Sequence, residues 1–365
     1  MTRDARDRIG GLDVARGLAV LGMFAAHMRL GEELTPAPST WAAIVDGRSS
    51  ILFATLAGVS VALLSGRTSP PEGRELTRVR VRLVVRAGWV FAIGWLLTRL
   101  DTFVAVILGV YGLLFVLVLP VVRWPVRRLL ALAAVLALLV PPLLVVLGQA
   151  LTTAGVEDAL VPFLAVTGYY PALLWIAFVL VGLAIGRLDL GAAGMRRRLA
   201  VAGAGAAVVG YGGGWLSTRL LAGGVPSAGP ETGFGVPGVF DVRWLTGAQP
   251  HSGTTFEVLG STGFAVLVVV GCLVLAERLP AVTAPVAAVG ALALTVYTVH
   301  ILAIRVLMDV APEAAEGLAA WTWFAVAALV GATAWRSAVG RGPLEWLVTW
   351  TSSRAARLPP SAPAV

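Results

Sequence analysis

Long apolar runs separated by short polar gaps occupy most of the chain. A membrane-spanning helix needs about 20 predominantly apolar residues, and ten runs approach that length. They cover roughly residues 12–30, 48–66, 81–99, 102–122, 128–148, 169–187, 199–221, 256–277, 285–308 and 317–338. The pattern predicts an all-α, polytopic integral membrane protein with about ten transmembrane helices.

The gaps between these runs alternate in charge. The second, fourth and sixth gaps carry arginines, namely Arg67, Arg74, Arg78, Arg80, Arg82, Arg123, Arg127, Arg128, Arg187, Arg196, Arg197 and Arg198. The first, fifth and ninth gaps carry acidic residues, namely Glu32, Glu33, Asp46, Glu157, Asp158, Asp309, Glu313 and Glu316. Because cytoplasmic gaps carry the excess of arginine, the N- and C-termini are both predicted to be cytoplasmic.

Two segments differ from this regular alternation. The seventh gap, 222–254, is long, rich in Gly and Pro, and predicted to lie outside the cell. A loop of that length is usually functional or disordered, and we expect a lid or an acceptor-side surface. After a single transmembrane domain over residues 1–340, residues 341–365 are expected to form an interfacial segment with Trp346 and Trp350 as membrane anchors, followed by a disordered cytoplasmic tail.

Composition supports a membrane protein. Hydrophobic residues make up 58% of the 365 residues and charged residues 13%, against about 25% charged in a typical soluble domain. The mean hydropathy is +0.86. The net charge of +8 comes from arginines in short gaps, so it indicates topology and no nucleic-acid partner is expected. The single Cys272 excludes an intrachain disulfide.

The first apolar run carries three ionisable residues, Asp13, Arg16 and His27. Such residues inside a membrane helix mark candidate functional sites. Eleven residues complete about three helical turns, so Arg16 and His27 project from nearly one face, about 16 Å apart along the axis. Asp13 can pair with Arg16 at i,i+3. In the alternative interpretation Arg16 snorkels to the inner interface and His27 ends the helix in water. Asp13 and Arg16 also argue for a retained first helix over a cleaved signal peptide.

A second histidine, His300, lies in the ninth run one helical turn after Tyr297. A cluster of His27, Tyr297 and His300 at one depth would be a candidate proton-handling site. Alternatively, Tyr297 and His300 hydrogen-bond neighbouring helices. The polar start of the second run, 46–50, could supply donors to this site or simply begin a helix in the headgroup region.

The sequence RIGGLDVARGLAVLGMFAAH resembles the first helix of the heparan-α-glucosaminide N-acetyltransferase-like proteins, within a superfamily of membrane acyltransferases whose first helix carries Arg, ten residues, then His. The second run, GRSSILFATLAGVSVALLSGR, is similar to that family's second helix. These motifs cover about residues 8–66. The segments PHSGTTFEVLGSTG, LTVYTVHI and GPLEWLVTW, within about residues 240–350, resemble the DUF418 membrane family.

The resemblance implies a transmembrane acyltransferase in the bacterial plasma membrane. It would transfer an acyl group, expected to be acetyl, from cytosolic acyl-CoA to a hydroxyl or amine of an extracytoplasmic sugar, lipid or cell-wall glycan. Arg16 with Asp13 beside it, and a cluster of arginines at the start of the third run, would bind the CoA phosphates because Arg forms bidentate charge-assisted hydrogen bonds. Those arginines are Arg78, Arg80 and Arg82.

On the acceptor side His27 would act as general base or as a transient acyl carrier. His300 would orient His27 or accept a second proton, with Tyr297 as the third candidate catalytic residue. The sequence leaves a homo-oligomer open.

Two other functions and a metal site compete with this interpretation. A proton-coupled solute transporter could use the same histidines as a relay, although no inverted repeat is evident. A non-catalytic membrane protein would tolerate changes at Arg16, His27 and His300. The chain has three histidines in all, the third being His251, but their spacing matches no zinc motif, and we expect no metal. His251 is expected in an unanchored loop.

Overall fold

The computed structural model describes residues 3–30, 38–221, 223 and 241–357. The described residues contain helices, turns and loops and no β-strand, so the all-α prediction is confirmed for them. Glu32, Glu33, most of the 222–254 gap and the tail beyond residue 357 lie outside the described residues.

The α-helices are α1 (Arg3–His27), α2 (Arg48–Leu64), α3 (Gly73–Thr98), α4 (Leu108–Leu117), α5 (Val126–Ala154), α6 (Leu160–Pro162), α7 (Ala172–Gly186), α8 (Ala193–Leu221), α9 (Thr255–Arg278), α10 (Pro280–Ala291), α11 (Ala293–Val310), α12 (Gly317–Ala338) and α13 (Pro343–Ala355). Shorter turns are η1 (Pro38–Val45), η2 (Leu119–Val121), η3 (Phe163–Thr167), η4 (Val242–Leu245) and η5 (Pro312–Ala315).

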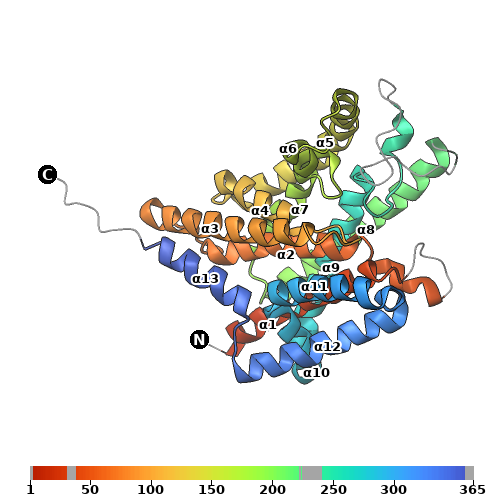
Figure 1. The fold of residues 1–365 in the computed structure, drawn as a ribbon. Helices are drawn as coiled ribbons and strands as arrows, with labels where there is room; N and C mark the ends of the chain where they lie inside the picture. The colour runs from red at the N-terminus through yellow and green to blue at the C-terminus, as the bar shows by residue number, and fades with distance from the viewer. Residues whose placement is uncertain (1–2, 31–37, 222, 224–240, 358–365) are drawn as a thin grey trace.

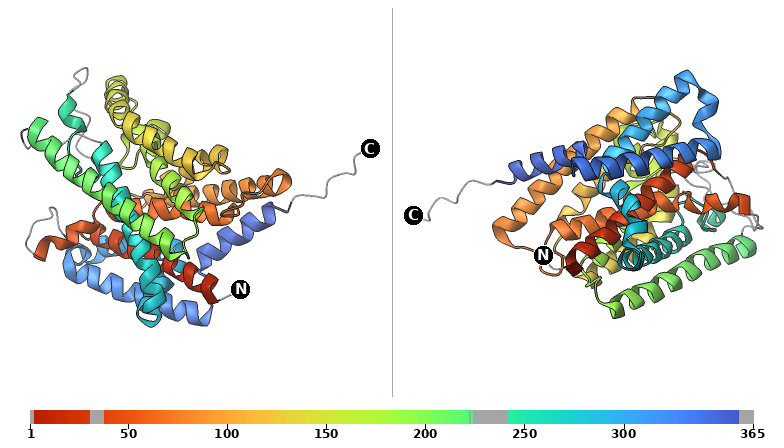
Figure 2. Two further views of the ribbon diagram at one scale, coloured as in Figure 1. Left: turned by 180° about the vertical axis from the view of Figure 1, so that it is seen from behind. Right: turned by 90° about the horizontal axis from the view of Figure 1, so that it is seen from below.

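Helix α1 packs against α2, α9 and α10, and α11 lies beside it (Figure 1). Helices α2 and α7 pack together, α3 packs on α4 and α13, and α8 runs along α9 at one flank of the molecule (Figure 2). The start of α1 and helix α13 lie on the same side of the bundle (Figure 1). The assignment of that side to the cytoplasm stays a prediction.

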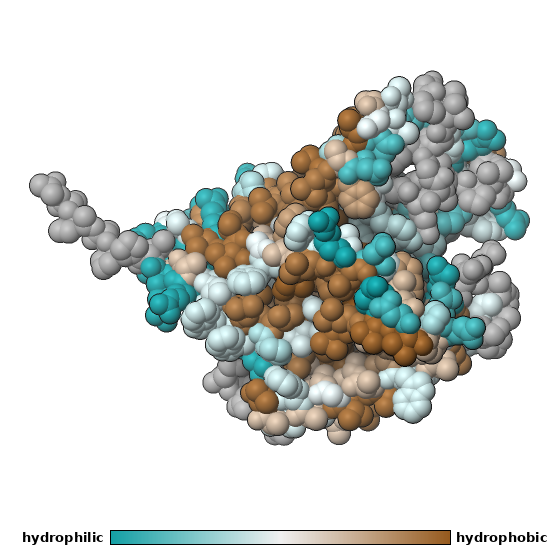
Figure 3. All heavy atoms as spheres, viewed as in Figure 1, coloured by the Kyte–Doolittle hydropathy of each residue, from teal (hydrophilic) through white to brown (hydrophobic). Residues whose placement is uncertain are grey.

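Seven helices of the described chain are long and apolar enough to cross a membrane, or eight if α6–η3 and α7, bent by 59°, form one span. The protein is therefore a multi-pass membrane protein, but the predicted ten spans are not confirmed. Hydrophobic residues cover most of the middle of the face in Figure 3, with hydrophilic residues toward its left and right. Helix α1 falls outside the seven because Asp13, Arg16 and His27 lower its hydropathy.

Two of the predicted spans differ in the structure. The run 102–122 contains α4, a helix of 10 residues, which at 1.5 Å per residue covers about half of the hydrocarbon core. The run 285–308 is broken at Leu292 into α10 and α11. Hydropathy averaged over a span cannot detect either feature, because both segments are apolar throughout.

Glycines allow the helices around α1 and α2 to approach closely. A Cβ on Gly17 would lie 2.0 Å from the carbonyl oxygen of Val286, and one on Gly290 would lie 1.8 Å from that of Asp13. The pair Gly58 and Gly182 joins α2 to α7 in the same way. Such close backbone contact is how small residues stabilise helix pairs in membranes.

The contact between α1 and α10 predicts the effect of one methyl group. In Gly290→Ala the new Cβ meets backbone atoms of Asp13 and Gly17, which cannot move without separating the helices. We expect the free energy of unfolding in detergent to fall by about 1–3 kcal/mol, although Ala favours helix more than Gly. The control Gly271→Ala, where the Cβ meets open space, should be at least as stable as the wild type. Equal stability of the two variants would contradict this packing.

Candidate functional site

Helix α1 carries both ends of the candidate site. The guanidinium of Arg16 contacts α10, and the imidazole of His27, eleven residues later, contacts α11. At 1.5 Å per residue the two residues are about 16 Å apart along the helix. The prediction that they project from one face is confirmed, because both reach the same broken α10–α11 segment.

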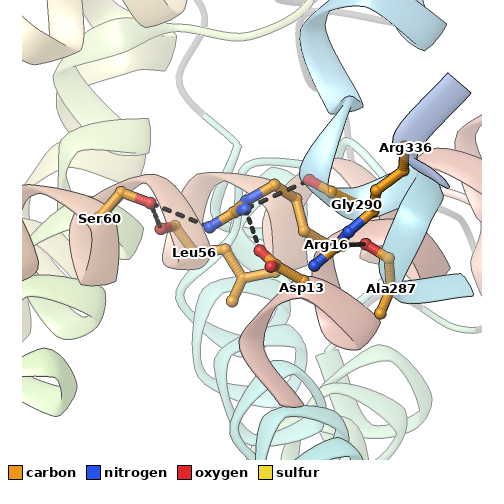
Figure 4. A network of polar contacts seen from close by, with 7 residues as sticks. All are labelled: Asp13, Arg16, Leu56, Ser60, Ala287, Gly290 and Arg336. Atoms are coloured by element: carbon orange, nitrogen blue, oxygen red, sulfur yellow. Dashed lines mark hydrogen bonds and ion pairs between the residues drawn. The ribbon is translucent and has the colours of Figure 1, made fainter. Parts of the chain in front are cut away.

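The guanidinium of Arg16 is held by three neighbours (Figure 4). Its Nη1 donates to Oδ1 of Asp13 at 2.7 Å and to the Gly290 carbonyl at 3.2 Å, and its Nη2 donates to Oγ of Ser60 at 3.4 Å. Gly290 lies in the last turn of α10, where carbonyl oxygens lack partners within the helix. The break between α10 and α11 therefore creates the acceptor that Arg16 binds.

Arg336 of α12 extends this network. Its Nη1 donates to the Ala287 carbonyl at 2.9 Å, beside the Asp13–Arg16 pair (Figure 4). One carboxylate thus lies between two guanidinium groups, which leaves the cluster with net positive charge. Such a cluster suits an anionic ligand.

His27 and His300 form a hydrogen-bonded pair. Nδ1 of His27 lies 2.9 Å from Nε2 of His300, and the rings are nearly parallel, 4° apart, with centroids separated by 5.2 Å. This hydrogen bond needs one N–H donor and one unprotonated nitrogen. The pair therefore contains a neutral imidazole, the form of histidine that can accept a proton.

Tyr297 completes the predicted cluster. Its ring centroid lies 5.0 Å from that of His300 and 6.4 Å from that of His27. The side chain is 2% exposed, and its hydroxyl lies beside the backbone of Ile107 and donates no hydrogen bond to the described part of the chain. The structure thus brings His27, Tyr297 and His300 together, which is one of the two arrangements that the sequence left open.

A cavity of about 270 Å³ is lined by Arg16 of the arginine cluster and by Tyr297 of this trio, whereas His27 and His300 lie outside its lining. Its polar lining residues are Arg16, Ser60, Arg86, Tyr111, Tyr297, Glu345 and Thr349. Arg16 and Tyr297 line the same space, so one ligand can contact both. The remaining lining residues are mostly apolar, as is typical of ligand pockets with few orienting polar groups.

The arginines of α3 lie on two different faces of the helix. Arg78, Arg82 and Arg86 recur every four residues and therefore share one face, and Arg86 lines the cavity. Arg80 lies on the opposite face and is exposed, which does not favour its predicted role in binding. Arg78 pairs with Glu75. Arg86 was not among the predicted residues, although its spacing of four residues from Arg82 places it on the same helix face.

Helix α13 also contributes to the cavity, beyond the interfacial role expected of this segment. Glu345 and Thr349 line the cavity, and Nη2 of Arg86 donates to Oγ1 of Thr349 at 3.4 Å. Glu345 accepts hydrogen bonds from the backbone N–H of Thr295 at 3.0 Å and from its hydroxyl at 2.6 Å. A carboxylate at these first-turn donors stabilises the start of α11. Trp346 and Trp350 are exposed and stack on each other.

Other polar residues flagged by the sequence lie elsewhere. Ser50 donates to the Gly47 carbonyl, as expected for a helix start. The expectation of an unanchored His251 is wrong, because the residue is 8% exposed, its ring packs on Tyr169, and its backbone N–H donates to Glu257 at 2.7 Å. Within the described residues no group of three or more His, Cys, Asp or Glu side chains could hold a metal ion.

Two protein-family models match the chain. The model described as heparan-alpha-glucosaminide N-acetyltransferase, catalytic, matches residues 8–211, and the model described as protein of unknown function (DUF418) matches residues 213–354. A search of curated proteins finds no match. The site draws on both matched segments, since Arg16, His27 and Arg86 lie in the first and Tyr297 and His300 in the second.

The ion pair of Asp13 and Arg16 predicts a stability effect. The two side chains are 12% and 22% exposed, so Asp13→Ala leaves a largely buried guanidinium without its carboxylate. We expect a loss on the order of 3 kcal/mol in unfolding free energy. The double variant Asp13→Ala/Arg16→Ala should recover part of this loss.

The matched control for that measurement is Asp309→Ala. It breaks the exposed pair with Arg305 on α11 and should cost less than about 1 kcal/mol. If Asp13→Ala costs no more than Asp309→Ala, the ion pair does not stabilise the bundle.

Proposed function

The chain belongs to the heparan-alpha-glucosaminide N-acetyltransferase catalytic family, and from this premise we propose that it transfers an acetyl group across the membrane. The donor is cytosolic acetyl-CoA, which the family uses. The acceptor is a hydroxyl or amine on the extracytoplasmic side of the plasma membrane. The observation that carries the proposal is the cavity that extends from Arg16 and Arg86 to Tyr297, beside the His27–His300 pair.

The donor end of the cavity has the charge that CoA requires. Arg16 and Arg86 line it, and Arg82 and Arg78 continue the same face of α3 toward the helix start. Guanidinium groups bind phosphates by bidentate, charge-assisted hydrogen bonds. In this proposal the arginines of α3 hold the phosphates of CoA, and Asp13 fixes the direction of the Arg16 side chain.

The other end of the cavity has groups that act on a thioester. Tyr297 lines the cavity, and its hydroxyl donates no hydrogen bond to described residues, so it is available to donate to the thioester carbonyl oxygen. A donor aimed at the oxygen that becomes negative in the tetrahedral intermediate lowers the barrier to acyl transfer. Tyr297 thus has the chemistry of an oxyanion donor.

The His27–His300 pair supplies the base. In direct transfer, the neutral imidazole removes a proton from the acceptor as its oxygen or nitrogen attacks the carbonyl carbon. The carbon–sulfur bond of acetyl-CoA then breaks, and the leaving thiolate takes up a proton. The hydrogen bond to His300 orients the His27 ring and stabilises the positive charge that develops on the pair.

Removal of the base predicts a large loss of rate. In His27→Ala we expect acetyl transfer by purified protein in proteoliposomes to fall by about 10²–10⁴-fold, measured as transfer of labelled acetyl from acetyl-CoA. The control His251→Gln alters an imidazole that packs on Tyr169 and is not part of the His27–His300 pair, and its folded fraction should keep wild-type activity. Wild-type transfer by correctly inserted His27→Ala protein would exclude the assignment.

The arginines of α3 give a second prediction with an internal control. Arg86→Gln removes a guanidinium from the cavity lining, and the loss of a charged hydrogen bond corresponds to roughly a 10-fold or larger rise in the Kd for acetyl-CoA. Arg80→Gln, on the exposed face of the same helix, should leave the Kd unchanged. Equal Kd values for the two variants would exclude Arg86 from the CoA site, and absence of acetyl-CoA binding by the wild type would favour solute transport over acetyl transfer.

A further inference from the structure

A second hollow lies on the opposite face of α11 from the cavity. This groove has a volume of about 850 Å³ and lies between α11 and α12, with Phe24 of α1 at its floor. Along α11 it extends from Leu292 to Leu307, a length of roughly 20 Å at 1.5 Å per residue. Tyr297 lines the cavity, whereas His300, one turn later, lines the groove. Because residues three apart are neighbours on a helix, and the two rings lie 5.0 Å apart, the cavity and the groove approach each other at Tyr297 and His300.

The groove is apolar and opens toward the membrane. None of its lining side chains carries a carboxylate or a guanidinium. Val299, Val306 and Trp323 on its edges are 57%, 61% and 75% exposed, and both helices qualify as membrane spans. Large exposed apolar side chains on a spanning helix face hydrocarbon. A molecule that enters this groove therefore comes from the bilayer, with an apolar body.

His300 is the polar group that this groove offers to an occupant. Two other polar lining side chains already have partners, since the Thr295 hydroxyl donates to Glu345 and the Trp335 indole donates to the Arg341 carbonyl. His300 is 3% exposed, and its Nδ1 faces the backbone carbonyls of Val296 and Tyr297 on its own helix without a hydrogen bond of regular geometry. A buried imidazole with spare hydrogen-bonding capacity suits a ligand with one polar group.

We propose that this groove binds the acetyl acceptor, and that the acceptor is a neutral lipid with a single hydroxyl on a long hydrocarbon chain. The inference rests on the proposed function and specifies its acceptor. A phosphate headgroup would find no cationic side chain in the groove, and a sugar would leave several buried hydroxyls without partners. The hydrocarbon chain lies along α11 and α12, and its hydroxyl reaches the His27–His300 pair.

The chemistry balances with the groups present. The lipid oxygen forms a bond to the carbonyl carbon of acetyl-CoA, and its proton passes to the imidazole pair. The carbon–sulfur bond breaks, and the CoA thiolate leaves and takes that proton from the imidazolium. The products are a lipid acetate ester, which stays in the membrane, and CoA, which leaves by the cavity.

The experiment measures acetylation of two acceptors by the full chain in proteoliposomes. One sample contains hexadecan-1-ol in the bilayer and labelled acetyl-CoA outside, and the other replaces the alcohol with glucosamine enclosed in the vesicles, on the side opposite acetyl-CoA. We expect hexadecyl acetate to form at least 10-fold faster than acetylated glucosamine. Acetylation of glucosamine without acetylation of hexadecan-1-ol would overturn the lipid acceptor and leave the proposed function intact. Acetylation of neither would overturn both.

Gly331 on α12 allows the groove to be blocked without disturbing the bundle. It lines the groove, and a Cβ on it meets open space. We expect Gly331→Leu to lower the rate with hexadecan-1-ol at least 10-fold while the KM for acetyl-CoA is unchanged. Gly205→Leu is the control, because Gly205 lies on α8, lines neither hollow, and also faces open space.

A second groove variant keeps the test valid if Gly331→Leu fails to fold. Ala327→Phe also narrows the groove from α12 and should reproduce the loss with hexadecan-1-ol. If either groove variant folds, binds acetyl-CoA normally and acetylates hexadecan-1-ol at the wild-type rate, the groove is not the acceptor site.

Discussion

The close approach of α1 to α10 is the constraint on which the rest of the site depends. Gly17 and Gly290 let the two backbones touch, and no larger residue fits there without moving a helix. This contact places the Arg16 guanidinium at the last carbonyls of α10. It also sets the register by which His27, three turns later, meets His300 on α11. The Arg16 guanidinium and the His27 imidazole are thereby fixed about 16 Å apart along a single helix.

The candidate site draws on both segments matched by family models. Neither the segment 8–211 nor the segment 213–354 contains the whole site. The first supplies the arginines and His27, and the second supplies Tyr297 and His300. The second also supplies Glu345 of α13, whose carboxylate accepts a hydrogen bond from the first turn of α11. Because the hydrogen bond between His27 and His300 joins the two segments, the imidazole pair forms only when both are folded together.

Helix α11 separates two environments of different polarity. On one face the cavity carries guanidinium, hydroxyl and carboxylate groups, and on the other the groove is apolar. Tyr297 and His300 lie one turn apart and face these two spaces. In the proposed function a highly charged donor in the cavity and an acceptor in the groove would meet at these two neighbouring residues, whose ring centroids are 5.0 Å apart.

The sequence by itself determined the local features of this protein. The all-α membrane class, most of the spans, and the common face of Arg16 and His27 follow from hydropathy and the helical period, which depend on neighbours within a few turns. The same period singled out Tyr297 and His300 as one turn apart. Arg78, Arg82 and Arg86 follow the same helical period, although the predicted CoA-binding arginines included Arg78 and Arg82 and not Arg86.

Only the tertiary structure decided what these residues meet. The break at Leu292, the short α4 and the burial of His251 depend on packing between segments far apart in the chain. The partners of Arg16 and His27 lie more than 270 residues away in sequence. The contribution of α13 to the cavity, and the position of α11 between the cavity and the groove, could not be predicted from the sequence either. Hydropathy reports the free energy of transfer of each segment into lipid. That free energy does not depend on which helices are in contact with one another.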